Sequence, residues 1–172
     1  MLKTLLKWLL VGTGLGLLGH SHAADTNDIS REHQLKTAYL FHFAELAEWP
    51  MHAPLTICLQ GQSPLRAYLP VLEGQQVRGQ ALHVVAGDGS AIDQCRILFL
   101  SEVAALSPSM LRLAQSRHVL LVSDAENFAR NGGMIQFTLR DNKLKLVVNL
   151  SSVKQAGLKL SSKLLRMAEI LE

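Results

Sequence analysis

Two cysteines, Cys58 and Cys95, are the residues of this 172-residue chain whose side chains could react with each other. A pair of thiols can form a disulfide, exchange electrons or bind a metal. The two lie too far apart in the chain for a C-x-x-C redox motif, so thiol exchange has no support. In an exported chain an even count favours one disulfide between Cys58 and Cys95, with two buried free thiols as the alternative.

The seven histidines could bind a metal or transfer protons, but their spacing matches no recognised zinc motif. The chain also lacks G-x-S-x-G, H-E-x-x-H and the phosphate-binding G-x-x-x-x-G-K-[ST]. Residues 61–63 could hold an anion on backbone amides before a helix, or form a plain strand-to-helix turn. We therefore predict no metal site, no cofactor and no catalytic activity.

The first 23 residues have the pattern of a cleavable signal peptide. Lys3 and Lys7 precede an uncharged apolar run, and small residues follow that run up to Ala23. The run is shorter than the roughly 20 residues that span a bilayer, although an uncleaved anchor helix is the alternative. We predict a signal peptide over residues 1–23, a single domain over residues 24–172 and a periplasmic location.

Composition and charge narrow the class of partner. With 17 Lys and Arg against 14 Asp and Glu the chain carries a formal charge of +3, and removing residues 1–23 takes away two lysines and no acid. The remaining charge of +1 gives no support to a nucleic-acid partner. The 48% hydrophobic content with 18% charged residues excludes a disordered tail.

Strands and helices alternate along the mature chain. A helix is predicted from Ser30 to about Glu48, ending before Pro50. Its residues at steps of three and four form an apolar stripe: Leu35, Ala38, Tyr39, His42, Phe43 and Leu46. Predicted strands and short helices then follow in turn: a strand over 55–59, a helix over 64–72, strands over 82–85 and 95–100, a helix from Pro108, a strand over 118–122 and a helix over 124–129.

The last third of the chain has a different pattern. Residues 134–139 and 144–150 alternate in polarity and predict an antiparallel hairpin. One helical turn follows over 149–156, and a closing helix begins at Ser161 or Ser162. The fold class is therefore α/β, with a mixed sheet of about six strands flanked by helices, a C-terminal antiparallel hairpin and a closing helix.

Three segments, in order, resemble the motifs of the YfiR family. The first is residues 35–44 closing on Glu48-Trp49-Pro50, and the second is Gly132-Gly133-Met134-Ile135. The third is Asn149-Leu150 followed by residues 156–165. The resemblance runs from about residue 35 to residue 170, nearly the whole mature chain.

The resemblance implies a periplasmic regulator without catalytic activity. Members of the family repress an inner-membrane diguanylate cyclase by binding its periplasmic sensor part, and they tend to form homodimers. An OmpA-like outer-membrane lipoprotein can sequester the repressor, so that cyclic di-GMP and biofilm formation rise. A periplasmic small-molecule-binding module, with its ligand at the carboxyl edge of the sheet, is the alternative function.

The resemblance also implies a surface for partners and small ligands. The matching positions are Val147, Val153 and Gln155, and Val147 stands where the family pattern has an acidic residue. On the face of its strand away from the apolar side, Val147 suits either a covering helix or a protein contact. Trp49 could anchor a partner or pack the first helix onto the sheet.

Overall fold

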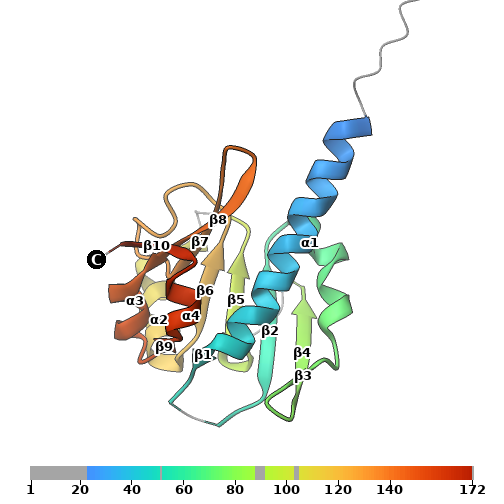
Figure 1. Cartoon of the computed structure of the whole chain (residues 1–172). Helices are drawn as coiled ribbons and strands as arrows, with labels where there is room; N and C mark the ends of the chain where they lie inside the picture. The colour runs from blue at the N-terminus through green and yellow to red at the C-terminus, as the bar shows by residue number, and fades with distance from the viewer. Residues whose placement is uncertain (1–22, 51, 88–91, 103–104, 172) are drawn as a thin grey trace, which may run out of the picture.

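The computed structural model describes residues 23–50, 52–87, 92–102 and 105–171. Within these residues the chain folds around one eight-stranded sheet with helices on both faces (Figure 1). In sheet order the strands are β10 (Ala168–Leu171), β8 (Lys143–Asn149), β7 (Ile135–Arg140), β6 (Leu120–Ser123), β5 (Ile97–Leu100), β2 (Leu55–Gln60), β4 (Gln80–Ala86) and β3 (Gln76–Val77). A separate ladder joins β1 (Ala47–Glu48) to β9 (Lys159–Leu160).

The strand directions make this a mixed sheet. Five neighbouring strands, β4, β2, β5, β6 and β7, run parallel, whereas β8 returns antiparallel to β7 and β10 runs parallel to β8. Every residue of β5 and β6 is buried, as expected where both faces of a parallel sheet are covered. The predicted α/β class with a mixed sheet is confirmed, with eight strands in place of about six.

Helices cover both faces of the sheet. Helix α1 (Ala23–Leu46) crosses one face, where the Phe43 ring stacks on Phe137 of β7 at 5.8 Å between centroids. Figure 1 shows α1 in front of the sheet, with its first turns extending beyond the strands, and α2 (Pro108–Arg117) behind it. The remaining helices are short: α3 (Leu150–Gln155), α4 (Ser162–Leu165), and the 3-10 helices η1 (Pro64–Ala67), η2 (Leu69–Leu72) and η3 (Ile92–Gln94).

Helix α1 begins earlier and ends earlier than predicted. It starts at Ala23, so Ser30 lies within the helix and does not cap it; the Ser30 hydroxyl accepts a hydrogen bond from the Tyr68 hydroxyl at 3.3 Å. It ends at Leu46, because the next two residues pair with β9. The predicted signal peptide, apart from Ala23, lies outside the described residues.

The apolar stripe predicted on α1 packs on the sheet only in part, through Tyr39, Phe43 and Leu46. Leu35 is 41% exposed, Ala38 and His42 are exposed, and only Phe43 of the six stripe residues is fully buried. The buried face lies beside the stripe. It consists of His33, Lys36, Thr37, Leu40, Phe43 and Ala44.

The end of the chain combines a short helix with an added strand. The predicted hairpin is confirmed, with Ile135 opposite Val148 and Phe137 opposite Leu146. The closing helix is present as the single turn α4, which is capped by the Ser161 hydroxyl. Residues 168–171, whose spacing suits that helix, instead form β10, because β8 offers a free row of backbone donors and acceptors.

At the other edge of the sheet the Glu73 carboxylate bonds to the backbone of β4. It accepts a hydrogen bond from the Val84 N–H at 2.7 Å and lies 3.1 Å from His83 Nδ1. The Val84 N–H, and after it the His83 side chain, hold the pKa of Glu73 below its usual value of 4.5. The carboxylate occupies a donor that an edge strand would otherwise present to another chain.

We expect the chemical shift of the Val84 amide to change with pH as Glu73 takes up a proton. Because the pKa is lowered on folding, the stabilisation is present above the unfolded pKa and is lost as the pH falls through the folded value. The Val84 amide chemical shift should therefore change at a midpoint below pH 4.5, and Glu73→Gln should remove that step. An amide shift that is flat with pH, or a step that survives Glu73→Gln, would contradict this assignment.

Candidate functional site

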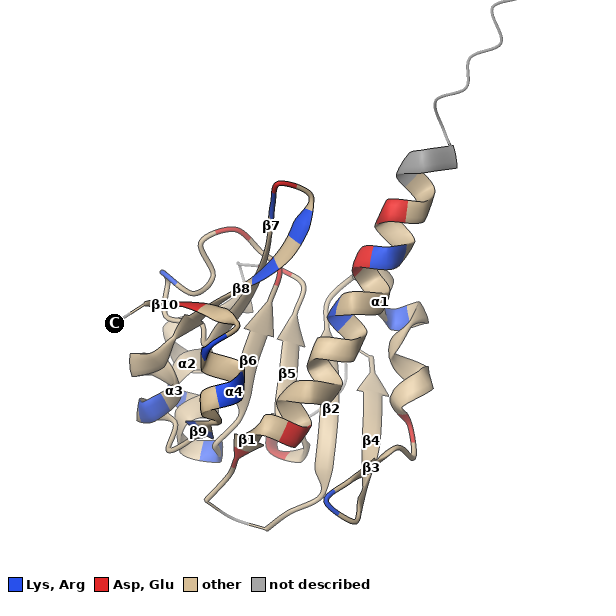
Figure 2. Ribbon diagram, in the orientation of Figure 1, with Lys and Arg blue, Asp and Glu red and all other residues tan. Residues whose placement is uncertain are grey.

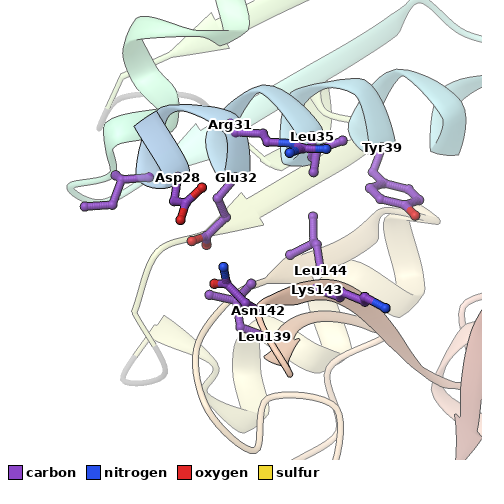
Figure 3. A pocket seen from close by; sticks show the side chains of 10 residues that line it. Asp28, Arg31, Glu32, Leu35, Tyr39, Leu139, Asn142, Lys143 and Leu144 are labelled. Carbon is purple, nitrogen blue, oxygen red and sulfur yellow. The ribbon is translucent and has the colours of Figure 1, made fainter. Parts of the chain in front are cut away.

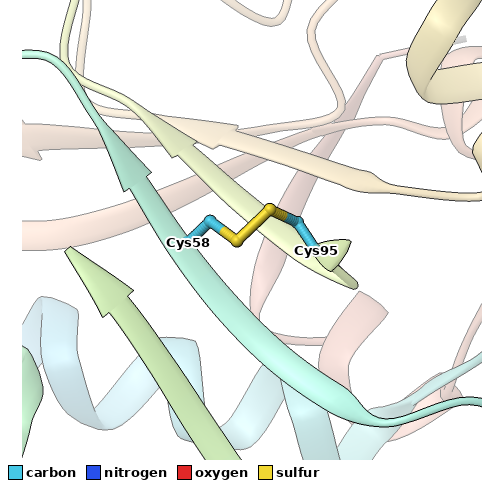
Figure 4. Close-up of a disulfide and its surroundings, with 2 residues drawn as sticks. All are labelled: Cys58 and Cys95. Carbon is cyan, nitrogen blue, oxygen red and sulfur yellow. A yellow bond between two sulfur atoms is a disulfide. The ribbon is translucent and has the colours of Figure 1, made fainter. Parts of the chain in front are cut away.

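The predicted disulfide between Cys58 and Cys95 is present (Figure 4). Cys58 lies within β2, and Cys95 precedes β5, which begins at Ile97 instead of Cys95. Their Cα atoms are 5.7 Å apart and both residues are buried. A buried disulfide between neighbouring strands has a structural role and fits an oxidising compartment.

Four of the described histidines, His33, His42, His83 and His118, take part in ring stacking or hydrogen bonds. His33 stacks on Tyr68 at 5.4 Å between ring centroids, and His118 Nδ1 donates to the Ala156 carbonyl at 2.8 Å. Within the described ranges, no group of three or more His, Cys, Asp or Glu side chains could hold a metal ion. The same part of the chain holds no helix with the length and apolar content to cross a membrane.

The carboxyl ends of β2 and β5 meet where ligands often bind in open α/β sheets. Here two side chains bond to the backbone at the end of β2. Ser101 Oγ donates to the Gln60 carbonyl at 3.1 Å, and Arg66 Nη2 donates to the Gly61 carbonyl at 3.0 Å. A Cβ at Gly61, where φ is +89°, would lie 2.1 Å from Ser101 Oγ, so the close approach depends on glycine.

A groove of about 800 Å³ separates the first half of α1 from the β7–β8 hairpin. In Figure 3 the helix forms one wall and the hairpin the other, with side chains from both directed into the space between them. Leu35 and Tyr39 of α1 face Leu139 and Leu144 of the hairpin across this space. The charged residues of the lining are Asp28, Arg31, Glu32 and Lys143. The groove therefore combines an apolar centre with charged rims.

A buried lysine, Lys36, lines a neighbouring cavity of about 280 Å³ that shares Glu32, Leu139 and Leu144 with the groove. Lys36 Nζ is 2.5 Å from a carboxylate oxygen of Glu32 and 2.6 Å from one of Asp124, which follows β6. The Lys36 side chain is only 5% exposed, whereas Glu32 and Asp124 are 21% and 30% exposed. This cluster ties α1 to the end of the central sheet and fixes the position of one groove wall.

Comparison with known proteins decides the family. A family model described as YfiR/HmsC-like (DUF4154) matches residues 33–169. The chain belongs to the YfiR/HmsC-like family. This makes it a periplasmic regulator of diguanylate cyclase signalling, and the buried disulfide agrees with that location.

The other comparisons concern the fold alone. No curated protein matches the chain. A crystal structure of an ABC domain in complex with L-Trp from Streptococcus pneumonia is similar, with a TM-score of 0.51 at 11% identity. The similarity covers 81% of this chain and 60% of that one, so the chain spans less than two thirds of that protein's length.

The YfiR-like motifs point to Val147, which lies on the hairpin face opposite the groove. Val147 is 7% exposed and is the register partner of Glu169 on β10. A cavity of about 180 Å³ beside it is rimmed by Arg130, Arg140 and Glu169. The Arg140 guanidinium is 2.5 Å from the Glu169 carboxylate. A carboxylate therefore lies next to Val147, on the neighbouring strand.

The other three predicted contact residues do not join Val147 in one site. Val153 is fully buried in the core, so its side chain positions α3. Gln155 is exposed at the end of α3, where its Oε1 accepts a hydrogen bond from Gln115 Nε2 at 3.1 Å. Trp49 packs partly buried against the core and lines a separate cavity of about 340 Å³ with Arg78 and Arg96.

The groove and its buried lysine are features that the sequence analysis missed. Lys36 stands three residues after His33 and four before Leu40, on the buried face of α1. A lysine at helical spacing among buried positions needs a carboxylate partner. The position of Lys36 could therefore have predicted a buried ion pair. Asp124 carried no such signal, because only the tertiary fold brings it to Lys36 from 88 residues away.

Proposed function

We propose that this chain is exported to the periplasm and represses an inner-membrane diguanylate cyclase by binding its periplasmic sensor part. The match of the YfiR/HmsC-like family model to residues 33–169 carries this proposal. Repression by contact needs no catalytic group and no cofactor. Loss of the repressor then raises cyclic di-GMP and promotes biofilm formation.

The proposal includes the organisation of the chain and its partners. Residues 1–23 direct export, residues 24–172 form the regulatory domain, and the regulator acts as a homodimer. An OmpA-like outer-membrane lipoprotein is a second partner that sequesters it. Val147, Gln155 and Trp49 contribute to partner contacts, and Val153 acts from the core by holding α3 in place. The charged pair Arg140–Glu169 beside Val147 supports a polar rim around a contact at Val147.

Deleting the gene should raise cellular cyclic di-GMP, because the cyclase loses its repressor. The level is measured by mass spectrometry of cell extracts, and biofilm mass should rise in parallel. Restoring the wild-type chain should return both values to those of the parent strain. Cyclic di-GMP that is unchanged by the deletion would contradict the proposed repression.

A charge change at the exposed Gln155 tests the contact surface in the same strain. Gln155→Glu should leave the melting temperature unchanged but weaken the restored repression, because surface substitutions seldom alter stability. Arg112→Glu, an exposed change on α2, serves as a charge-changing control that should restore repression fully. Equal repression by both variants would remove Gln155 from the proposed surface.

A further inference from the structure

Helix α1 carries a second apolar face that the described part of the chain covers only in part. Leu35, Ala38, Tyr39, His42 and Leu46 line a hollow of about 280 Å³ whose other wall is Lys163 and Met167. This hollow shares Leu35 and Tyr39 with the groove beside the hairpin. The two hollows adjoin at these residues, and together we call them the α1 channel.

Exposed apolar side chains gather along the α1 channel. Of the six large apolar residues that are exposed within the described ranges, four line it: Ile29, Leu35, Leu139 and Met167. They are between 41% and 55% exposed. Such clustering on one side of a molecule marks a contact surface, whereas scattered exposed residues do not.

The shape of the α1 channel suits a helix. Its lining residues on α1 recur at steps of three and four, which leaves the ridges and grooves that a second helix packs against. From Ile29 to Leu46 the channel follows about 26 Å of helix axis, at 1.5 Å per residue. An amphipathic helix of about 17 residues would fill this length.

The charges at the rim of the α1 channel favour an acidic partner. Arg31 and Lys143 stand at one end and Lys163 at the other, all exposed, and none has a carboxylate within ion-pair distance among the described residues. Figure 2 shows Lys and Arg on the hairpin and on α4, the two elements of the far wall, with one acidic residue, Asp141, in the hairpin turn. Of the lining carboxylates, Glu32 is paired with Lys36, which leaves Asp28 as the opposing charge.

A second copy of this chain fits these charges less well. A two-fold axis across the α1 channel would exchange its ends and bring Lys163 of each copy toward Arg31 and Lys143 of the other. Like charges placed together disfavour an interface. We propose that the α1 channel binds an amphipathic helix of a partner protein, with its apolar face on Leu35 and Met167 and carboxylates on both flanks.

The test uses the chain as purified from the periplasm and an 18-residue peptide with leucines on one helical face and glutamates on both flanks. The control peptide has lysine in place of every glutamate. At low salt the acidic peptide should bind about tenfold more tightly than the basic one, and added salt should weaken it. Leu35→Asp should reduce binding about tenfold or more, since it places a charge in the apolar contact.

Three further measurements make the result decisive. Val71→Asp, at an apolar residue that is 67% exposed outside the channel, should leave binding unchanged. Lys163→Glu should remove the preference for the acidic peptide while Leu35 remains in place. Amide shifts on peptide addition should be confined to α1, the hairpin tip and α4. Equal binding of both peptides, no binding of either, or equal loss in Val71→Asp would overturn the proposal.

A membrane surface is the competing occupant. Binding to phosphatidylglycerol vesicles that Leu35→Asp abolishes, together with no binding of the acidic peptide, would assign the α1 channel to lipid and overturn the helix proposal. The peptide result does not depend on cyclase control. If peptide binding fails while deletion of the gene still raises cyclic di-GMP, only the helix proposal is wrong. If the peptide binds while the deletion leaves cyclic di-GMP unchanged, only the proposed repression is wrong.

Discussion

Replacing Cys58 with serine should lower the free energy of unfolding by about 2–4 kcal/mol. The disulfide closes a loop with a sequence separation of 37, and losing it frees that loop in the unfolded chain. Both cysteines are buried, so Cys58→Ser also leaves a polar hydroxyl and the free thiol of Cys95 in the core. Chemical denaturation of the variant and the wild type measures the difference.

The matched control is reduction of the wild-type chain. Adding reductant to the wild type should lower its melting temperature toward that of a Cys58→Ala/Cys95→Ala variant, which should not respond to reductant. A wild-type melting temperature that is identical with and without reductant, under conditions that reduce buried disulfides, would refute the bond.

Replacing Lys36 with alanine should cost about 2–3 kcal/mol of stability. Removing one member of a fully buried ion pair typically costs more, about 3–5 kcal/mol. The value is lower here because Glu32 and Asp124 are 21% and 30% exposed and can regain water. Thermal and urea unfolding of Lys36→Ala give the measurement.

Two variants separate the charge of Lys36 from its packing. Lys36→Met keeps the aliphatic stem in place and should lose less stability than Lys36→Ala. Lys154→Ala removes an exposed lysine of α3 and should stay within about 0.5 kcal/mol of the wild type. If Lys36→Ala is as stable as Lys154→Ala, the cluster does not anchor α1.

Much of the order of elements follows from local patterns in the sequence, although the helix predicted over 124–129 is wrong and turns take its place. Alternation of polarity placed the hairpin, and the observed pairs Ile135–Val148 and Leu139–Leu144 confirm its apolar face. Pro108 predicted the start of α2, which the Ser107 hydroxyl caps by accepting the Met110 N–H at 3.1 Å. These features depend on neighbours in the chain, and for that reason they could be predicted.

Features that depend on distant contacts could not be predicted. The spacing of Ala168 and Leu171 suits a helix, but these residues pair with the free edge of β8 and form β10 instead. On α1 the more apolar stripe was predicted, yet the face with Lys36 and Thr37 is buried, because both side chains find partners there. The α1 channel forms only because the hairpin and the region of α4 lie beside the helix, and no local pattern predicts these contacts.

The most direct test of the account compares two forms of this chain in the deletion strain. One is the full chain and the other lacks residues 1–23, and both are expressed to equal levels. The account predicts that the full chain lowers cyclic di-GMP to the parental level and that the shortened form leaves it high. Equal lowering by both forms, or no effect of either, would contradict repression from the periplasm.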